Sequence, residues 1–343
     1  MAGLLDKLKK NSKIAETSTL EKSAFYGDKS FVPTNVPAIN IALSGSIRGG
    51  LMSGLTVVAG PSKHFKTSIC LVMAAAFLKA DPEAVVLFYD SEFGSPSSYF
   101  EAYDVDPARV LHTPITDIEQ LKFDIMAQLN GLTKNDKVLI LIDSVGNLAS
   151  KKEVEDALNE KSAADMTRAK QLKSLFRMVT PHLTMKNVPM LAIAHTYQTQ
   201  EMYSKAVIGG GTGITYSAND AWIISRSQEK DGTDLVGYTF KINIEKSRLV
   251  KERSSIPLTV TFDGGINRWS GLLDIALELG FVVKPSNGWY QRVDPETGEV
   301  QEQKYRAKDT DSAEFWEPLL SSKVFASAIE KHYRLNVVNN DEI

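Results

Sequence analysis

The chain is poor in the features that mark secreted and membrane proteins. Cys70 is the only cysteine among 343 residues, so an internal disulfide is excluded and a reducing compartment is expected. The longest apolar run, residues 71–78, is far shorter than the roughly 20 residues that span a bilayer. The N-terminal stretch is basic and amphipathic but lacks the apolar core and cleavage site of a signal peptide. We therefore expect a cytoplasmic protein that is not bound to a membrane.

A strong charge of one sign is also missing. Lysine and arginine number 39 and aspartate and glutamate 42, which gives a net charge of −3. A protein of this balance does not attract nucleic acid through its overall field, so DNA binding would need a local basic patch. The content of 43% hydrophobic and 24% charged residues is ordinary for a globular protein, and the length suggests roughly two domains.

From Pro33 onward, short apolar runs alternate with helical patterns, which predicts a parallel α/β sheet. The runs are apolar almost throughout, as expected of strands that are covered on both faces. The expected strands are residues 55–59, 84–89, 137–142 and 188–194, and the expected helices are residues 67–80, 118–132 and 162–180.

Three later runs alternate between apolar and polar residues, which is typical of antiparallel strands that extend the sheet. They are residues 220–225, 237–244 and 256–262. Beyond Ser270 the pattern becomes helical and more polar. We predict an N-terminal arm over residues 1–30, a core over 31–269 and a small C-terminal domain over 270–343.

A segment with the character of a phosphate-binding loop lies between the first strand and the first helix of the core. In this context backbone amides and a helix N-terminus face the phosphates of a nucleotide, the lysine contacts phosphate oxygens and the threonine hydroxyl holds Mg²⁺. The residues predicted to surround the phosphates are Gly60, Pro61, Ser62, Lys63, His64, Phe65, Lys66, Thr67 and Ser68.

The loop departs from the pattern G-x-x-x-x-G-K-[ST], because Phe65 replaces the second glycine. A glycine there permits a backbone conformation that other residues tolerate poorly. Taken alone, the segment could also be a surface turn that contains Lys-Thr. Two carboxylates favour the nucleotide site: Asp143 follows the strand at 137–142 and is placed to bind the metal, and Glu92 follows the strand at 84–89 and is placed to activate water. The alternative is that Asp90, Glu92 and Asp143 cap strands in solvent.

These residues resemble one family closely. Residues 39–45, Gly49-Gly50-Leu51 and Gly54 lead into the phosphate loop as they do in RecA-type recombinases, and Asp90-Ser91-Glu92 and Ile142-Asp143-Ser144 resemble the acidic strand ends of that family. The recombinases of T-even-type bacteriophages are the most similar group, and they share the phenylalanine in the loop. The resemblance covers residues 20–335 and includes the segments 147–153, 195–202, 209–213 and 263–266. It implies a RecA-like P-loop ATPase core with a mostly parallel central sheet flanked by helices, a short N-terminal arm and a small C-terminal α/β domain.

The resemblance also implies roles for single residues. Glu92 would be the catalytic base, and Tyr99 would stack on adenine, unless it is a core tyrosine. His195 would sense the γ-phosphate, although a lone histidine is more often structural. Lys246 and Arg248 would reach the ATP of a neighbouring subunit and act with Lys66 on the phosphates, unless they belong to a solvated charge run.

The resemblance also implies two loops that would bind DNA, near residues 150–161 and 197–216. In both, lysines would supply charge, and in the second the backbone of a glycine-rich stretch would contact phosphates. The candidate residues are Lys151, Lys152, Lys205, Gly209, Gly210, Gly211, Thr212 and Gly213. Arg168 and a basic helical face at Lys170, Lys173 and Arg177 would add to them, unless that face is an ordinary solvated surface.

Together these features imply an ATP- and Mg²⁺-dependent recombinase that forms a helical filament on single-stranded DNA and exchanges strands with double-stranded DNA. The arm would contact the next subunit, and a mediator or loader and a single-strand-binding protein would be partners, in the host bacterial cytoplasm if the protein is phage-encoded. The rival from another class is a hexameric RecA-fold helicase or translocase. A DNA-binding protein with a decayed ATP site and a small-molecule kinase are further alternatives.

Overall fold

The computed structural model describes residues 2–23, 25, 30–159, 167–199, 204–231, 234–261 and 265–335. The chain divides into two compact units, Met1–Phe31 and Val32–Ile343. The first unit contains helix α1 (Ala2–Asn11) and a 3₁₀ turn, η1 (Leu20–Lys22). The apolar side chains of α1 at Leu4, Leu5 and Leu8 are exposed, so this unit builds no core of its own around them.

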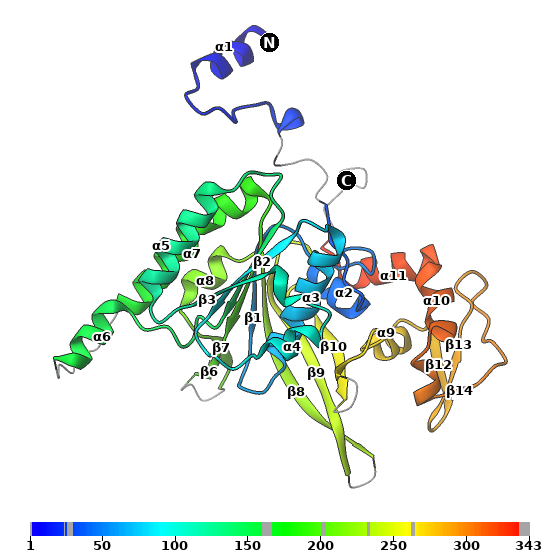
Figure 1. Cartoon of the computed structure of the whole chain (residues 1–343). Helices are drawn as coiled ribbons and strands as arrows, with labels where there is room; N and C mark the ends of the chain where they lie inside the picture. The colour runs from blue at the N-terminus through cyan, green and yellow to red at the C-terminus, as the bar shows by residue number, and fades with distance from the viewer. Residues whose placement is uncertain are drawn as a thin grey trace. The chain divides into compact units, whose positions relative to one another are not determined.

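The second unit is organised by a central sheet, which has nine strands within the described residues, in the order β11-β10-β9-β8-β1-β5-β4-β2-β3. The strands from β8 to β3 are parallel to one another, and those from β8 to β11 are antiparallel (Figure 1). The bounds are β1 (Gly54–Ala59), β2 (Val85–Asp90), β3 (Val110–Pro114), β4 (Val138–Asp143), β5 (Pro189–Ala194), β8 (Asp220–Asp231), β9 (Asp234–Ser247), β10 (Ser255–Thr261) and β11 (Gly265–Ile266).

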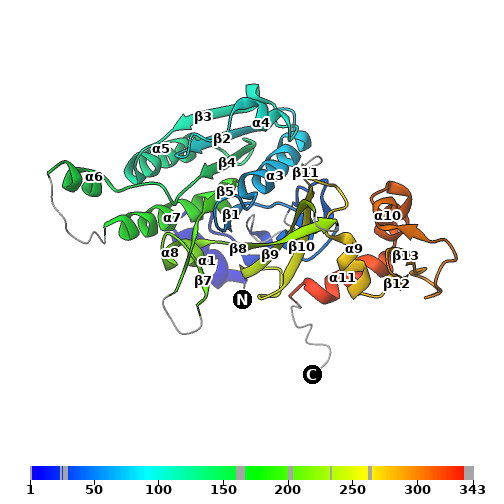
Figure 2. The same cartoon turned by 90° about the horizontal axis from the view of Figure 1, so that it is seen from below.

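Both faces of the central parallel strands are buried, because alternate side chains enter two separate hydrophobic clusters. Along β4, Leu139 and Leu141 join one cluster while Ile140 and Ile142 join the other. Helices α2 (Pro37–Ser44) and α3 (Lys66–Ala80) cover the first face, and α5 (Ile118–Gly131), α7 (Thr167–Lys186) and α8 (Thr212–Ser217) cover the second. Figure 2 shows α3 on one side of the sheet and α5, α7 and α8 on the other. The expected α/β class with a mostly parallel, two-sided sheet is confirmed.

The strands and helices predicted for the core are present, with ends that differ by up to six residues, and the predicted residues 162–166 and 262 lie outside the described part of the chain. Other elements were not expected: the edge strand β3, helix α2, and the short elements α4 (Ser97–Glu101) and η2 (Pro107–Arg109). The segment after Ser150, expected to be a loop, forms helix α6 (Lys151–Leu158), whose first turn is closed by a capping box between Ser150 and Glu153. The segment after His195 begins with a hairpin of β6 (Thr196–Gln198) and β7 (Ala206–Ile208).

The C-terminal part combines helices with a small antiparallel sheet in the order β12-β13-β14. Its aromatic residues Phe315, Trp316 and Phe325 are buried and belong to the same hydrophobic cluster as α3. The elements are α9 (Leu272–Glu278), β12 (Val282–Ser286), β13 (Trp289–Arg292), β14 (Tyr305–Arg306), η3 (Ala307–Thr310), α10 (Ala313–Ser321) and α11 (Lys323–Tyr333). Among the described residues, no helix has the length and apolar content that crossing a bilayer requires.

Candidate nucleotide-binding and catalytic site

The ends of four parallel strands bring the predicted site residues to one edge of the sheet. The backbone continues to pair beyond the strands: the amide of Gly60 donates to the Ala194 carbonyl at 3.2 Å, and that of Ser91 donates to the Asp143 carbonyl at 2.8 Å. Because β1, β5, β4 and β2 are parallel, the segments that follow them leave from the same side. This places the phosphate loop, His195, Ser144 and Glu92 along one edge.

The phosphate loop keeps a glycine-like backbone at Phe65. This residue has φ 52° and ψ 26°, in the left-handed region, and stands at the N-cap of α3. Its ring lies 5.3 Å from that of Phe240 on β9, centroid to centroid. The carbonyl of Phe65 accepts the first hydrogen bond of the helix from Ile69 at 3.0 Å. The phenylalanine therefore reproduces the turn for which the family pattern uses glycine, and aromatic packing offsets its strain.

Contacts from inside the loop and from β8 hold the loop in shape. The His64 ring donates from Nδ1 to the Ser62 carbonyl at 2.9 Å, and Arg226 donates to the Lys63 carbonyl at 3.2 Å. Burial lowers the pKa of His64, and the nearby Arg226 and Lys66 charges lower it further. His64 therefore contributes to the shape of the loop through its contact with Ser62.

Lys66 and Asp143 place opposite charges behind the loop. Lys66 is 7% exposed and its Nζ donates to the Pro61 carbonyl at 2.8 Å. Burial lowers the pKa of Lys66, while the charges of Glu92 and Asp143 raise it. Burial raises the pKa of Asp143 to about 6, against the hydrogen bond from Thr67 and the charge of Lys66. The Thr67 hydroxyl donates to Asp143 Oδ2 at 2.7 Å.

This set of groups suits a nucleotide phosphate with a divalent cation. A buried ammonium and the positive end of the 15-residue helix α3 lie at the same loop, and both favour an anion there. The paired oxygens of Thr67 and Asp143 are hard ligands of the kind that Mg²⁺ prefers. The residues present therefore fit both the phosphate and the metal that the loop pattern implies.

Glu92 lies in a polar contact that the sequence did not reveal. Its Oε1 atom accepts one hydrogen bond from the Ser144 hydroxyl at 2.7 Å and one from His195 Nε2 at 3.0 Å. A carboxylate can only accept, so His195 carries its proton on Nε2. The structure thus brings together two predicted residues, Glu92 and His195, through an unpredicted third.

Asp90 differs in role from the other acidic strand ends. It is 4% exposed, and its Oδ1 accepts from the amides of Glu92 and Phe93 at 2.9 and 2.8 Å. Its Oδ2 lies 3.2 Å from Nε2 of His112 on β3. Asp90 therefore shapes the turn that carries Glu92, and neither Asp90 nor Asp143 is a solvated strand cap.

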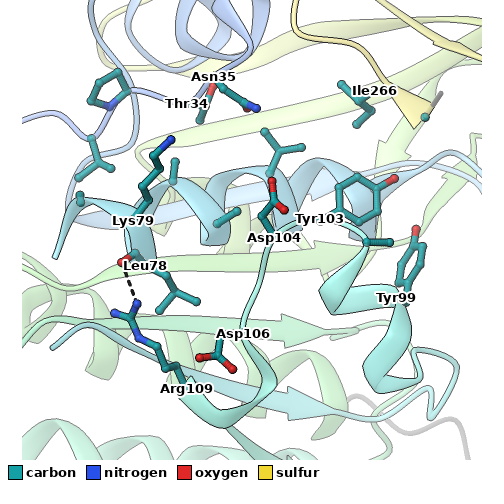
Figure 3. Close-up of a pocket in the computed structure, with 18 of the residues that line it drawn as sticks. Thr34, Asn35, Leu78, Lys79, Tyr99, Tyr103, Asp104, Asp106, Arg109 and Ile266 are labelled. Atoms are coloured by element: carbon teal, nitrogen blue, oxygen red, sulfur yellow. Dashed lines mark hydrogen bonds between the residues drawn. The ribbon is translucent and has the colours of Figure 1, made fainter. Parts of the chain in front are cut away.

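Tyr99 lines a pocket of about 1070 Å³ beside α3. Its hydroxyl forms a hydrogen bond with Ser68, in the first turn of α3, and its ring meets Tyr103 edge-on at 5.4 Å. Burial raises the pKa of Tyr99 to about 12. Figure 3 shows Tyr99 and Tyr103 close together, with Ile266 above them on the same side of the view. The pocket reaches the phosphate loop at Phe65, so it offers room for a nucleotide base.

Lys246 and Arg248 are not brought to the phosphate loop of their own chain. Lys246 pairs with Ala221 near the start of β8, whereas the phosphate loop follows the end of the adjacent strand β1. Its ammonium donates to the carbonyls of Thr215 and Tyr216 at 2.9 and 2.8 Å. Burial lowers the pKa of Lys246, and the Arg248 charge lowers it further. A role at the phosphates would therefore require a second copy of the chain.

The first candidate DNA segment is partly described, because residues 160 and 161 lie outside the described residues. Lys151 is exposed, and Lys152 pairs with Asp156 one turn along α6. The Arg168 guanidinium donates to the carbonyls of Leu148, Val145 and Gly146 at 2.8 to 3.1 Å. Arg168 therefore fastens α7 to the chain that follows β4.

In the second candidate segment, residues 200–203 lie outside the described residues. The amide of Gly209 donates to the His195 carbonyl at 2.7 Å, and a Cβ on Gly213 would lie 2.8 Å from Cβ of Lys173. These two glycines hold the segment against the core. Lys205, Gly211 and Thr212 are exposed, and Gly210 is half-buried.

Several residues of this region escaped prediction. Ser91 and Ser144 were not predicted, although each follows a predicted acidic residue in the sequence. The position of Ser144 directly after Asp143, at the end of a strand, was the signal that could have indicated it. Tyr103 was hidden because it lies in the turn that follows the unexpected helix α4. Ile266 is far away in the sequence and reaches the pocket only through the sheet order.

The sequence is similar to known proteins over nearly its whole length. Residues 16–267 match the family model for the RecA N-terminal domain, and residues 269–329 match the model for the C-terminal domain of the bacteriophage T4 recombination and repair protein. The chain is 53% identical over 347 residues to the recombination and repair protein of Enterobacteria phage T4, across 100% of this chain and 89% of that protein. It is 27% identical over 276 residues to protein RecA of Streptomyces ambofaciens, across 79% of this chain and 71% of that protein.

Proposed function

The chain belongs to the RecA family of recombinases, and we propose that it hydrolyses ATP to drive DNA strand exchange. In this proposal copies of the chain form a helical filament on single-stranded DNA and pair it with homologous duplex, in recombination, repair and recombination-dependent replication. The observation that carries the proposal is the single cluster of Lys66, Thr67, Asp143 and Glu92 at the end of the parallel strands.

Each residue of the cluster has a distinct task. Lys66 and the N-terminus of α3 bind the β- and γ-phosphates, and Thr67 and Asp143 hold Mg²⁺. When bound, Mg²⁺ neutralises charge on the phosphate oxygens. Glu92 accepts a proton from water as the water oxygen bonds to the γ-phosphorus. The bond from that phosphorus to the β,γ-bridging oxygen breaks, and ADP leaves with the oxygen.

The base of the nucleotide occupies the pocket beside Tyr99. The half-buried ring offers a flat apolar face of the kind on which a purine stacks. Its hydroxyl is already held by Ser68, so the ring orientation is fixed before a nucleotide binds.

His195 joins the ATP site to the second DNA segment. Its ring contacts Glu92, while its carbonyl accepts from the amide of Gly209. When DNA binding shifts that segment, the surroundings of Glu92, the catalytic base, therefore change. This link supports hydrolysis that is promoted by DNA. We assign DNA contact to Lys151, Lys152 and Lys205 and to the stretch Gly209–Gly213. In this stretch Gly211 and Thr212 are exposed, whereas Gly213 is buried against Lys173.

Assembly completes the site. Lys246 and Arg248 of one subunit act on the phosphates held by the next, and the arm at residues 1–30 contacts a neighbouring subunit. A loader and a single-strand-binding protein regulate access to DNA. Hydrolysis then depends on the filament, since these two cations lie away from their own phosphate loop.

The test is steady-state ATP hydrolysis with and without single-stranded DNA, followed by a strand-pairing assay. We expect DNA to stimulate turnover, Glu92→Gln to lower the stimulated turnover by more than about 100-fold, and the exposed Glu317→Gln on α10 to behave as wild type. Turnover that ignores DNA, or that Glu92→Gln leaves undiminished, would refute the coupled mechanism. Polar unwinding of duplex without strand pairing would indicate a helicase.

A further inference from the structure

The two oxygens of the Glu92 carboxylate have different surroundings. Oε1 accepts both hydrogen bonds, from Ser144 Oγ at 2.7 Å and from His195 Nε2 at 3.0 Å. Oε2 has no hydrogen bond to another residue in the described part of the chain. Because Oε1 already has two donors, Oε2 is the oxygen with capacity for a further proton donor.

The two donors differ in how firmly they are held. The Ser144 side chain is fully buried, at 0% exposure. The His195 side chain is 35% exposed and begins the segment that leads into β6. Ser144 is therefore the donor held in the core, and His195 is the donor bonded to the second DNA segment.

Ser144 is fixed by a reciprocal pair of hydrogen bonds with Ser91. The Ser91 hydroxyl donates to the Ser144 carbonyl at 2.8 Å and accepts from the Ser144 amide at 3.1 Å. Next to them, the Ser91 amide donates to the Asp143 carbonyl at 2.8 Å. These three bonds extend the pairing of Asp90 with Asp143 between β2 and β4. The amide and the carbonyl of Ser144 are therefore both held by Ser91.

These bonds connect Asp143, the proposed metal ligand, with Glu92, the proposed catalytic base. Asp143 accepts from Thr67 through its side chain, and the next residue, Ser144, donates to Glu92. The Glu92 backbone is held separately by Asp90. The Glu92 amide is thus bonded to buried Asp90, and the Glu92 carboxylate is bonded to buried Ser144.

We propose that Ser144 is a positioning residue for hydrolysis, whose hydroxyl, locked by Ser91, holds Oε1 of Glu92 so that Oε2 accepts the proton of the attacking water. The inference rests on the proposed role of Glu92 as the base. Ser144 does not touch the reacting atoms itself. Its contribution is the orientation of the carboxylate, and misplacing a catalytic group by about 1 Å can cost roughly 100-fold in rate.

The experiment compares DNA-stimulated ATP hydrolysis by full-length variants. Ser144→Ala is expected to lower kcat by roughly 10- to 100-fold with KM for ATP within about twofold, since binding uses Lys66 and Thr67. Ser144→Thr keeps the hydroxyl and is expected to recover most of kcat. Ser91→Ala releases the Ser144 backbone and is expected to give an intermediate loss.

A matched control removes an equivalent contact elsewhere. The Ser46 hydroxyl donates to Glu330 Oε1 at 2.7 Å and links the segment after α2 to helix α11. Ser46→Ala therefore removes a serine–glutamate bond of the same length and is expected to leave kcat and KM unchanged. Thermal midpoints of all variants separate a loss of fold from a loss of positioning.

A double-mutant cycle with Glu92→Gln separates the two levels of the proposal. If Ser144 acts through the carboxylate, Ser144→Ala adds no further loss in the Glu92→Gln background. Full activity of Ser144→Ala, beside an inactive Glu92→Gln, overturns the role of Ser144 alone. That role is also overturned if the two losses multiply, or if KM rises in place of a fall in kcat. Full activity of Glu92→Gln overturns the proposed function itself.

Discussion

Phe65 tests whether packing can offset a strained backbone in a phosphate loop. Its φ of 52° and ψ of 26° are left-handed, which costs a residue other than glycine roughly 1–2 kcal/mol. The half-buried ring lies 5.3 Å from that of Phe240. Such an aromatic pair contributes about 0.5–1.5 kcal/mol beyond area burial, and partial burial of the ring adds roughly 1 kcal/mol.

Two substitutions separate these contributions. Phe65→Ala loses the ring but keeps the strain, so we expect the free energy of unfolding to fall by about 2 kcal/mol. Phe65→Gly loses the same ring and relieves the strain, so we expect a fall smaller by about 1 kcal/mol. The assay is equilibrium unfolding in urea, with KM for ATP measured alongside and expected to follow the same order.

Phe93 is the matched control, because it has φ 55° but is 60% exposed. Without a packed ring to lose, Phe93→Gly is expected to be neutral or stabilising by up to about 1 kcal/mol. If Phe65→Ala proved as stable as Phe65→Gly, the strain in the loop would be negligible and the reasoning would be wrong. If Phe65→Gly were more stable than the wild type, packing on Phe240 would not offset the strain.

Two further predictions concern structure and coupling. The Arg109 guanidinium donates to the carbonyls of Leu78, Asp81 and Ala84 at 2.6 to 3.0 Å, so Arg109→Met should lower the free energy of unfolding in urea by about 2 kcal/mol. The control is Arg48→Met, which removes one exposed side-chain hydrogen bond of 3.3 Å and should lower that free energy by less than about 0.5 kcal/mol. Equal losses for the two variants would contradict the argument. A Cβ on Gly209 would lie 2.8 Å from the His195 carbonyl oxygen, so Gly209→Ala should weaken the stimulation of ATP hydrolysis by DNA while KM for ATP stays within about twofold. The control is Gly131→Ala, because the new methyl group would have open space around it. If DNA stimulated the Gly209→Ala variant as strongly as the wild type, the link through His195 would be disproved.

The main elements of the core could be predicted from the sequence because their signals are local. A strand buried on both faces is apolar throughout, as β4 and β5 are, and a lysine and threonine at a strand-to-helix turn indicate a phosphate loop. Strand β3 escaped because it is an edge strand whose residues are largely exposed. Helix α6 escaped because its charged residues suggested a loop, although the capping box of Ser150 and Glu153 was present in the sequence.

The sequence by itself determined the chemistry available to this protein: Lys66, Thr67, Glu92 and Asp143 follow strands or open a helix, and parallel strands end at one edge. Only the tertiary structure decided which of these groups touch. Strand order places β5 between β1 and β4, and this order brings His195 and Ser144 to the same oxygen of Glu92. No local pattern encodes that meeting, because hydrogen bonds across non-consecutive strands depend on how the whole sheet packs.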